Sequence, residues 1–280
     1  MITEDQNLRL QQVHPLVATS GFASIEEYVN FLIHRRAYEE AASMAQHKTV
    51  LDWGCNNGYG IGVMRSLGCG EISGIDLNSQ AIASARERLG NDVELILFDG
   101  KRAPLPSDQF DVITSFQCIE HVVDHADYLS EIRRLLTPDG VAIFTTPNAT
   151  IRLDPGMKPW NEFHVLEFRP SELKDLLSEH FSMVTIQGLF GKTELHRIEV
   201  ERCERARHEA RSTAVSKPEP RPRPIYNAIR QLTPTPVVQF VKGLVPSPKP
   251  PILPEHSTSE FYYKQTELDS ALDLMAICRK

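Results

Sequence analysis

An apolar segment that ends in an acidic residue and a Gly/Asn-rich turn constrains the fold of this chain more than any other feature. Val50 and Leu51 lead into Asp52, and residues 53–58 contain two glycines and two asparagines. Glycine adopts positive φ without steric cost, and asparagine tolerates it better than most residues. Such a turn lets backbone N–H groups approach a small molecule at the carboxyl end of a strand. An ordinary strand-to-helix turn stays open at this point, because a glycine-rich loop alone is a weak signal.

Two further predicted strands also end in acidic residues. The second, residues 72–75, is followed by Asp76, and the third, residues 93–98, is followed by Asp99 and Gly100. A carboxylate at the tip of the second strand is well placed to accept both hydroxyl protons of a ribose. An acid after the third strand can accept a hydrogen bond from an adenine amine. Three successive strands that each end in aspartate therefore predict a nucleoside-binding edge of a sheet.

The glycine spacing argues against a nicotinamide-dependent enzyme. A G-x-G-x-x-G fingerprint that starts at Gly58 requires glycine at position 63, where the chain has Val63. The sequence contains no G-x-x-x-x-G-K-S/T phosphate loop either. The sequence therefore argues against a dinucleotide site and against a P-loop nucleotide site.

Strand and helix patterns alternate through most of the chain. This alternation predicts a parallel sheet with right-handed crossovers. Asn78 or Ser79 is expected to cap the helix at 79–89, and Asp124 the helix at 125–136. The predicted strands are 48–53, 71–76, 93–98, 110–116, 140–146, 182–188 and 272–278, and the predicted helices are 25–46, 59–67, 79–89, 125–136 and one that opens at Pro170.

Together with residues 110–122 and 136–144, these motifs resemble the class I S-adenosylmethionine (SAM) dependent methyltransferases. The resemblance covers about residues 30–190 and resumes near 270–280. Within this family the chain is similar to the enzymes that methylate small molecules, and its motifs resemble those of ubiquinone-biosynthesis O-methyltransferases. The family implies a doubly wound α/β fold with a seven-stranded, mostly parallel, Rossmann-like sheet and an antiparallel last strand. It also implies SAM as the cofactor.

The expected organisation departs from the simplest family plan by an insertion between strands six and seven. Residues 1–24 are a polar lead-in, 25–190 the SAM-binding core, 191–265 the insertion and 266–280 the final core strand. Within the insertion, Glu194–Arg211 is predicted to be a charged, solvated helix. Residues 217–254 hold 11 of the 19 prolines and carry six Lys/Arg against one acid, with two short apolar-faced helices expected near 225–244. A lid over the acceptor, a membrane-surface or anionic-acceptor contact, and plain scaffolding all stay open for this segment.

The family resemblance assigns the donor site. Backbone groups of the Gly54–Gly58 turn are expected to contact the methionyl moiety, and Asp52 to support that turn or meet the amino group. Asn56 stands where the family often has glycine, so its side chain is expected to narrow the pocket. Arg35 and Tyr38 match a family Arg-x-x-Tyr that reaches the methionyl carboxylate. The full set of predicted cofactor-binding residues is Arg35, Tyr38, Asp52, Gly54, Asn56, Gly58, Asp76, Leu77, Asp99, Gly100 and Phe116.

Two histidines are the candidate catalytic residues. His121 follows the fourth strand at the functional edge of the sheet, and histidine titrates near neutral pH, as suits a general base. His164 lies in the segment after the fifth strand, which in the family often borders the acceptor. Each of the two could instead be a structural hydrogen bonder. The predicted reaction is methyl transfer to a small or medium organic acceptor, with a hydroxyl oxygen of a sugar, glycolipid intermediate, phenol or secondary metabolite preferred over nitrogen or carbon.

Residues 117–121 and His164 are also similar to a motif of metal-dependent small-RNA 3′-terminal ribose methyltransferases. Those enzymes use Glu-x-x-Glu-His and a later histidine around a divalent ion. Gln117 stands at the first glutamate position here, and a neutral amide is a poorer cation ligand than a carboxylate. The sequence therefore favours a site without a metal.

Composition agrees with a cytoplasmic enzyme that does not bind nucleic acid. The net charge of −7 argues against a general nucleic-acid binder, and the five scattered cysteines are typical of reduced thiols. The polar N-terminus shows no signal-peptide pattern and no membrane span. A SAM-binding protein without turnover that regulates a partner is the rival interpretation, and the oligomeric state is left open.

Overall fold

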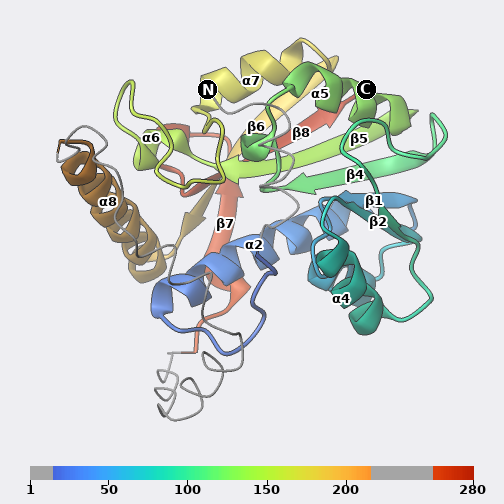
Figure 1. Ribbon diagram of the computed structural model, residues 1–280, viewed down its shortest axis with the longest axis horizontal. Coiled ribbons are helices and arrows are strands. Elements are labelled where there is room, and N and C mark those ends of the chain that lie inside the picture. The colour runs from blue at the N-terminus through green and yellow to red at the C-terminus, as the bar shows by residue number, and fades with distance from the viewer. Residues whose placement is uncertain (1–14, 216–254) are drawn as a thin grey trace, which may run out of the picture.

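The computed structural model describes residues 15–215 and 255–280 (Figure 1). Eight strands form one sheet in the order β3-β2-β1-β4-β5-β8-β6-β7. The strands are β1 Val50–Trp53, β2 Ile72–Asp76, β3 Leu95–Leu97, β4 Phe110–Phe116, β5 Leu136–Pro147, β6 Met183–Gly191, β7 Phe261–Lys264 and β8 Asp273–Arg279. The helices are α2 Ile25–Met44, α3 Tyr59–Ser66, α4 Ser79–Leu89, α5 His125–Leu135, α6 Ala149–Arg152, α7 Pro170–Ser178 and α8 Thr193–Val215, with short 3-10 turns η1 Ile119–His121, η2 Thr258–Glu260 and η3 Leu268–Ser270.

The first five strands are parallel, and their spatial order reverses at β1. β1 pairs with β2 on one side and with β4 on the other, and β3 and β5 extend the sheet outward. In open α/β sheets, ligands bind outside the carboxyl ends of the strands at such a reversal. The topology therefore directs the search for a site to the loops that follow β1 and β4.

The sequence prediction of seven strands was wrong by one. β8 is antiparallel to both β5 and β6, as expected for the last strand. An additional strand, β7, pairs antiparallel with the edge of β6 and belongs to the segment expected to be an insertion. Its four residues follow the proline-rich stretch and are too few to show a clear period-two pattern, so only the available edge of β6 defines them as a strand.

Each face of the sheet is covered by its own set of helices, because apolar residues alternate along the strands. Leu51 and Ile113 face a core completed by α5 and α7. Their neighbours Val50 and Val112 face a second core completed by α2, α3 and α4. Asn78 caps α4 and Asp124 caps α5 through side-chain acceptors, as predicted. These two layers fix the strand ends that carry the site.

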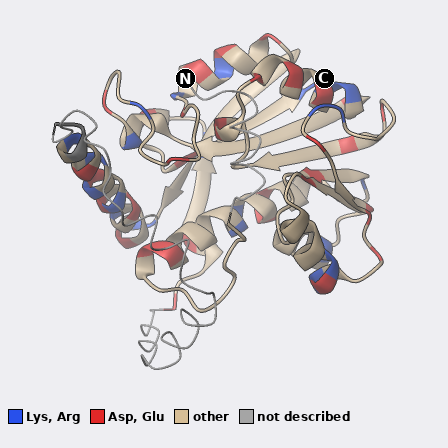
Figure 2. Cartoon of the chain, viewed as in Figure 1, with Lys and Arg blue, Asp and Glu red and all other residues tan. Residues whose placement is uncertain are grey.

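Helix α8 carries charges of both signs along its length (Figure 2), as predicted for residues 194–211. It is not fully solvated, since Leu195 and Cys203 are buried and the helix packs against α2 and α6. Residues 217–254, with their two expected short helices, lie outside the described residues. Within the described part of the chain, none of the helices has the length and apolar character needed to cross a membrane.

Candidate active site

A cleft lies at the carboxyl ends of β1, β2 and β4, where the strand order reverses. Residues that line it include Gly54 and Asn56 after β1, Asp76 at the end of β2, and Phe116 and His121 at and after β4. We call it the donor cleft. It brings together side chains from segments more than sixty residues apart in the sequence.

The turn after β1 has the backbone geometry that its composition predicts. Gly54, Asn56 and Gly58 all have positive φ, of 80°, 46° and 71°. A side chain at Gly54 would collide with the sulfur of Cys118, so glycine is required there for close packing as well as for conformation. Gly58 caps the N-terminus of α3 and, unlike Gly54 and Asn56, does not line the cleft. The backbone N–H groups of the turn are hydrogen-bonded within the protein, that of Gly54 to the carbonyl of Ile75 and that of Asn56 to Asp76.

Asp76 forms the floor of the donor cleft beside this turn. Its carboxylate accepts hydrogen bonds from the backbone N–H groups of Asn56 and Asn78, both at 2.8 Å. Leu77 lines the cleft next to it and also borders an adjoining hollow, where Asp99 lies. The Asp99 carboxylate accepts from the backbone N–H of Lys101, after Gly100 with its φ of 85°. Asp76, expected to bind the ribose, and Asp99, expected to bind the adenine, therefore lie in neighbouring hollows that share Leu77.

Asp52 lies behind the turn and does not line the donor cleft. It is fully buried and accepts hydrogen bonds from the hydroxyls of Thr114, at 2.8 Å, and Tyr38, at 3.2 Å. Burial raises the pKa of Asp52 to about 7, and the charge of Asp76 acts in the same direction, while the two hydroxyl hydrogen bonds oppose the shift. The arrangement supports the turn rather than presenting a carboxylate to a ligand.

Helix α2 brings Tyr38 to the cleft but not Arg35. The Tyr38 ring packs edge-on against Phe116, with centroids 4.8 Å apart. Arg35 is exposed and forms an ion pair with Glu39 at 3.0 Å. His34, which the sequence reasoning missed, lines the cleft in its place. His34 is four residues from Tyr38 and Arg35 is three, so both share a helical face with Tyr38 and spacing alone could not select His34.

The side chain of Asn56 holds the N-terminal segment against the cleft. Its Oδ1 accepts from the backbone N–H of Val17 at 3.0 Å, and its Nδ2 donates to the carbonyl of Pro15 at 3.2 Å. Asn57 adds a hydrogen bond from its side chain to the carbonyl of Val17 at 2.8 Å. Val17 itself lines the cleft. We call this set of hydrogen bonds the Asn56 strap. The sequence did not predict it, because residues 1–24 show only a polar composition.

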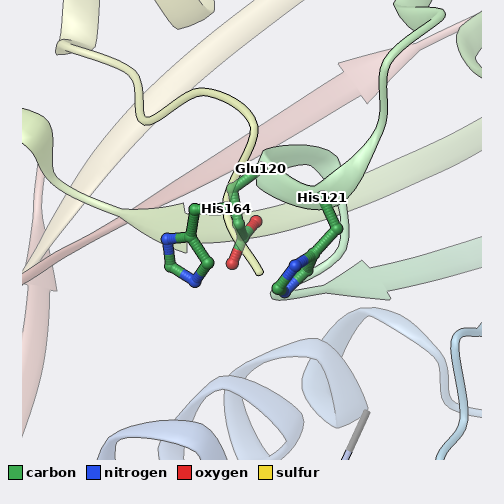
Figure 3. A group of neighbouring side chains, drawn as sticks. All are labelled: Glu120, His121 and His164. Carbon is green, nitrogen blue, oxygen red and sulfur yellow. The ribbon is translucent and has the colours of Figure 1, made fainter. Parts of the chain in front are cut away.

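The two predicted catalytic histidines lie against each other at one end of the cleft. Their ring centroids are 4.8 Å apart and the rings are nearly perpendicular. Backbone hydrogen bonds from Val165 and Leu166 to the carbonyl of Glu120 bring the two segments together. His121 lines the donor cleft and His164 does not. Figure 3 shows His164 on the far side of Glu120 from His121.

Hydrogen bonds orient both imidazoles. His121 Nδ1 lies 2.8 Å from the carbonyl of Phe163, and burial lowers the pKa of His121 despite that hydrogen bond. His164 Nδ1 lies 2.7 Å from Glu167, whose carboxylate also receives two hydrogen bonds from buried Arg152. These bonds hold the pKa of Glu167 below its usual range, although its burial acts in the opposite direction.

Gln117 follows the last residue of β4 and has a φ of 54°. Its amide donates to both carboxylate oxygens of buried Asp273, at 3.1 Å, and to the hydroxyl of Thr145. Burial raises the pKa of Asp273 well above its ordinary value. The interaction ties the cleft to β8.

The doubly wound sheet, the Gly/Asn turn and the aspartate at the tip of β2 together define the class I methyltransferase arrangement. Residues 51–144 match the family model described as "Methyltransferase domain". The chain therefore carries a class I SAM-dependent methyltransferase domain.

Two curated relatives and one solved structure illustrate the similarity. A probable SAM-dependent methyltransferase of Mycolicibacterium smegmatis is 35% identical over 174 residues, which are 59% of this chain and 64% of that protein. A ubiquinone biosynthesis O-methyltransferase of Thiobacillus denitrificans is 37% identical over 106 residues, 36% of this chain and 45% of that protein. A SAM-dependent methyltransferase of Archaeoglobus fulgidus shares the fold with a TM-score of 0.51, at 16% identity over 89% of this chain and 94% of that one. The chain thus spans less than two thirds of the length of the first of these curated relatives.

Proposed function

We propose that this protein transfers the methyl group of SAM to a hydroxyl oxygen of a small or medium organic acceptor. The observation that carries the proposal is that one cleft is lined by both Asp76 and His121. A donor held by the Gly/Asn turn and Asp76 then has its methyl group close to an imidazole. Sugars, glycolipid intermediates, phenols and secondary metabolites all fit this description.

Methyl transfer is an in-line displacement in which the S–CH₃ bond breaks as the O–CH₃ bond forms. The sulfonium of SAM is already activated, so the protein contributes chiefly by holding donor and acceptor together, an effect worth about 7–11 kcal/mol in favourable cases. A hydroxyl acceptor must also lose its proton. His121 has a lowered pKa and is therefore neutral at pH 7, which suits it to accept that proton.

The resemblance to a ubiquinone biosynthesis O-methyltransferase supports oxygen as the accepting atom. Nitrogen or carbon methylation remains the alternative within the class. The proposed organisation is a SAM-binding unit of residues 25–190 and 266–280, with residues 191–265 as an insertion between its last two strands. Within the SAM-binding unit, Asp99 is proposed to bind the adenine amine and Tyr38 the methionyl group.

The test combines binding with turnover. Calorimetry should show SAM and S-adenosylhomocysteine binding with one site per chain, and radiolabelled SAM should transfer its methyl group to at least one hydroxyl compound in an acceptor panel. The His121→Gln variant should keep SAM affinity and lose turnover by about a hundredfold, in line with loss of a positioned base.

The rival interpretation is a SAM-binding regulator without turnover. It predicts normal SAM binding in the parent protein with no transfer to any hydroxyl, amine or carbon acceptor. Transfer to amines alone, unaffected by His121→Gln, would instead overturn the oxygen assignment while keeping the enzyme class.

A further inference from the structure

Three side chains form a compact cluster of nitrogen and oxygen donors, and one of them, His121, lines the donor cleft. Glu120 and His121 belong to η1, and His164 belongs to the segment after β5. One potential ligand atom from each lies within 4.8 Å of the others. Figure 3 shows the carboxylate of Glu120 between the two imidazole rings. The fold thus brings two imidazoles and a carboxylate to one point from two separate segments.

Both imidazoles have one nitrogen held by an acceptor. A backbone carbonyl can only accept, so His121 Nδ1 carries the proton toward Phe163 and its Nε2 keeps a lone pair. The ionised Glu167 carboxylate likewise accepts from His164 Nδ1, which leaves a lone pair on His164 Nε2. Histidines that bind metals almost always donate their other N–H to a carboxylate or a carbonyl in this way.

Glu120 supplies the third donor, a buried carboxylate with one oxygen that lacks a hydrogen-bond partner among the described residues. Its side chain is fully buried, and Oε2 accepts from the hydroxyl of Thr146 at 3.0 Å. Its other oxygen, Oε1, has no hydrogen-bond partner among the described residues. A buried carboxylate without full compensation is stabilised in its ionised form by a cation.

We propose that Glu120, His121 and His164 bind a divalent transition-metal cation such as Zn²⁺, Mn²⁺ or Co²⁺. Two imidazoles and one carboxylate suit these ions, whereas Mg²⁺ and Ca²⁺ prefer oxygen ligands throughout. Metal–ligand bonds of 2.0–2.2 Å place ligand atoms about 3–4 Å apart. The three side chains therefore need to close only slightly, and the amide of Asn161, now 2.9 Å from His164 Nε2, has to release that nitrogen.

The inference departs from the expectation that the sequence supports, a site without a metal. That expectation rested on Gln117 in place of a carboxylate. In the structure the Gln117 amide donates to the carboxylate of Asp273. Three protein ligands are sufficient for a cation that keeps open positions for water or substrate. Of the three ligands, His121 lines the donor cleft.

The consequence for catalysis rests on the proposed function. A cation that binds the acceptor hydroxyl lowers the pKa of that hydroxyl, so its proton passes to water and the alkoxide attacks the methyl group. The sulfonium then leaves as a neutral thioether. In that case the Nε2 lone pair of His121 is occupied by the cation, and His121 acts as a ligand instead of as the base.

The decisive measurement is metal binding by the full chain, which does not require an acceptor. The protein is stripped with a chelator and titrated with Zn²⁺ and Mn²⁺ by calorimetry, and with Co²⁺ by visible absorption. We expect one cation per chain, and an affinity that falls at least tenfold in Glu120→Gln and in His164→Gln. His208→Gln, which removes an exposed histidine of α8 far from the cluster in sequence, should leave the affinity unchanged. SAM affinity of each variant reports whether the fold is intact.

Two results would overturn the site. One is a stripped parent protein that binds none of the three cations stoichiometrically. The other is binding that persists equally in Glu120→Gln and His164→Gln. Failure of SAM binding would overturn the proposed function and leave the metal result standing. If methyl transfer is observed and a chelator does not reduce it, the cation has no part in the reaction and His121 stays the base.

Discussion

Asp76 is the residue whose environment most directly suggests a ligand contact. It lines the donor cleft, and its carboxylate already orders the Gly/Asn turn through the backbone N–H of Asn56. Ribose hydroxyls that donate to this carboxylate would form charge-assisted hydrogen bonds, which are stronger than neutral ones.

Replacing Asp76 with asparagine should weaken SAM binding by about 1–3 kcal/mol, because the ribose loses a charged acceptor. Calorimetry measures the change, and Asp92→Asn, at an exposed position after α4, is the matched control. Unchanged SAM affinity in Asp76→Asn, with a normal melting temperature, would remove the ribose assignment.

The buried carboxylate of Asp52 leads to a prediction about pH and stability. Its pKa is about 7 in the folded protein, against 3.8 for an ordinary aspartate. Between these values the folded state holds a proton that the unfolded state has lost, so stability falls as pH rises from about 4 to 7 and then levels off. Asp52→Asn should remove this contribution, on the order of a few kcal/mol. Urea denaturation of both proteins from pH 4.5 to 8 measures it, and a pH-independent difference between them would contradict the raised pKa.

At this scale the sequence predicted the residues whose position follows from local backbone geometry. Gly54 and Asn56 follow the first predicted strand and Asp76 ends the second, and all three line the donor cleft. Strand ends can be located from sequence patterns, whereas the roles of these residues rest on the family resemblance. Arg35 and His34 could not be separated by sequence patterns. One residue rotates a helix by about 100°, and only the packing of α2 on the sheet decides which side chain reaches the cleft.

Among the elements, the N-terminal segment has the most specific local contact. The Asn56 strap places Val17 in the donor cleft, and it depends on the side chain at a position where glycine would satisfy the backbone equally well. The strap is therefore separable from the turn that carries it.

Asn56→Gly should keep the fold, since glycine adopts a φ of 46° without strain, and should raise the SAM dissociation rate about five- to thirtyfold through loss of one or two hydrogen bonds that hold the strap. Stopped-flow kinetics measures this rate. Deletion of residues 1–18 should have a similar effect, and the two changes together should not add, because they remove the same contact. Additive effects would mean that Asn56 acts on SAM directly.

Sequence patterns predicted some helices and strands at their observed bounds and missed one short edge strand. β4 and α4 were predicted at their observed bounds, since each has a clear period and a polar boundary. β7 was missed, because a four-residue strand at a sheet edge is defined by its partner β6 and not by its own composition.

For the molecule as a whole, the charge distribution gives the next prediction. The segment 217–254 carries a local charge of +5 in a chain of −7. Replacing its six Lys/Arg residues with glutamine should leave SAM affinity unchanged. If the segment is a lid that favours anionic acceptors, KM for such an acceptor should rise severalfold and KM for its neutral analogue should not. The salt dependence of the parent's preference should fall in parallel.

The same variant separates the other interpretations of the segment. Co-sedimentation of the parent with anionic liposomes that is lost in the neutral variant would support a membrane contact. Equal KM values and no liposome binding in either protein would mean that the segment is scaffolding.

The position of β8 also has a consequence for how the molecule is made. This strand lies between β5 and β6, although about eighty residues separate it from β6 in the sequence. During synthesis, β1 to β5 can pair as soon as they leave the ribosome, whereas β6 has no neighbour on the β5 side until residues 273–279 emerge. For that interval the nascent chain exposes two unpaired strand edges, which are templates for association with other chains. Pauses or truncations before residue 273 are therefore expected to produce aggregation, even though every residue of the donor cleft has already been translated.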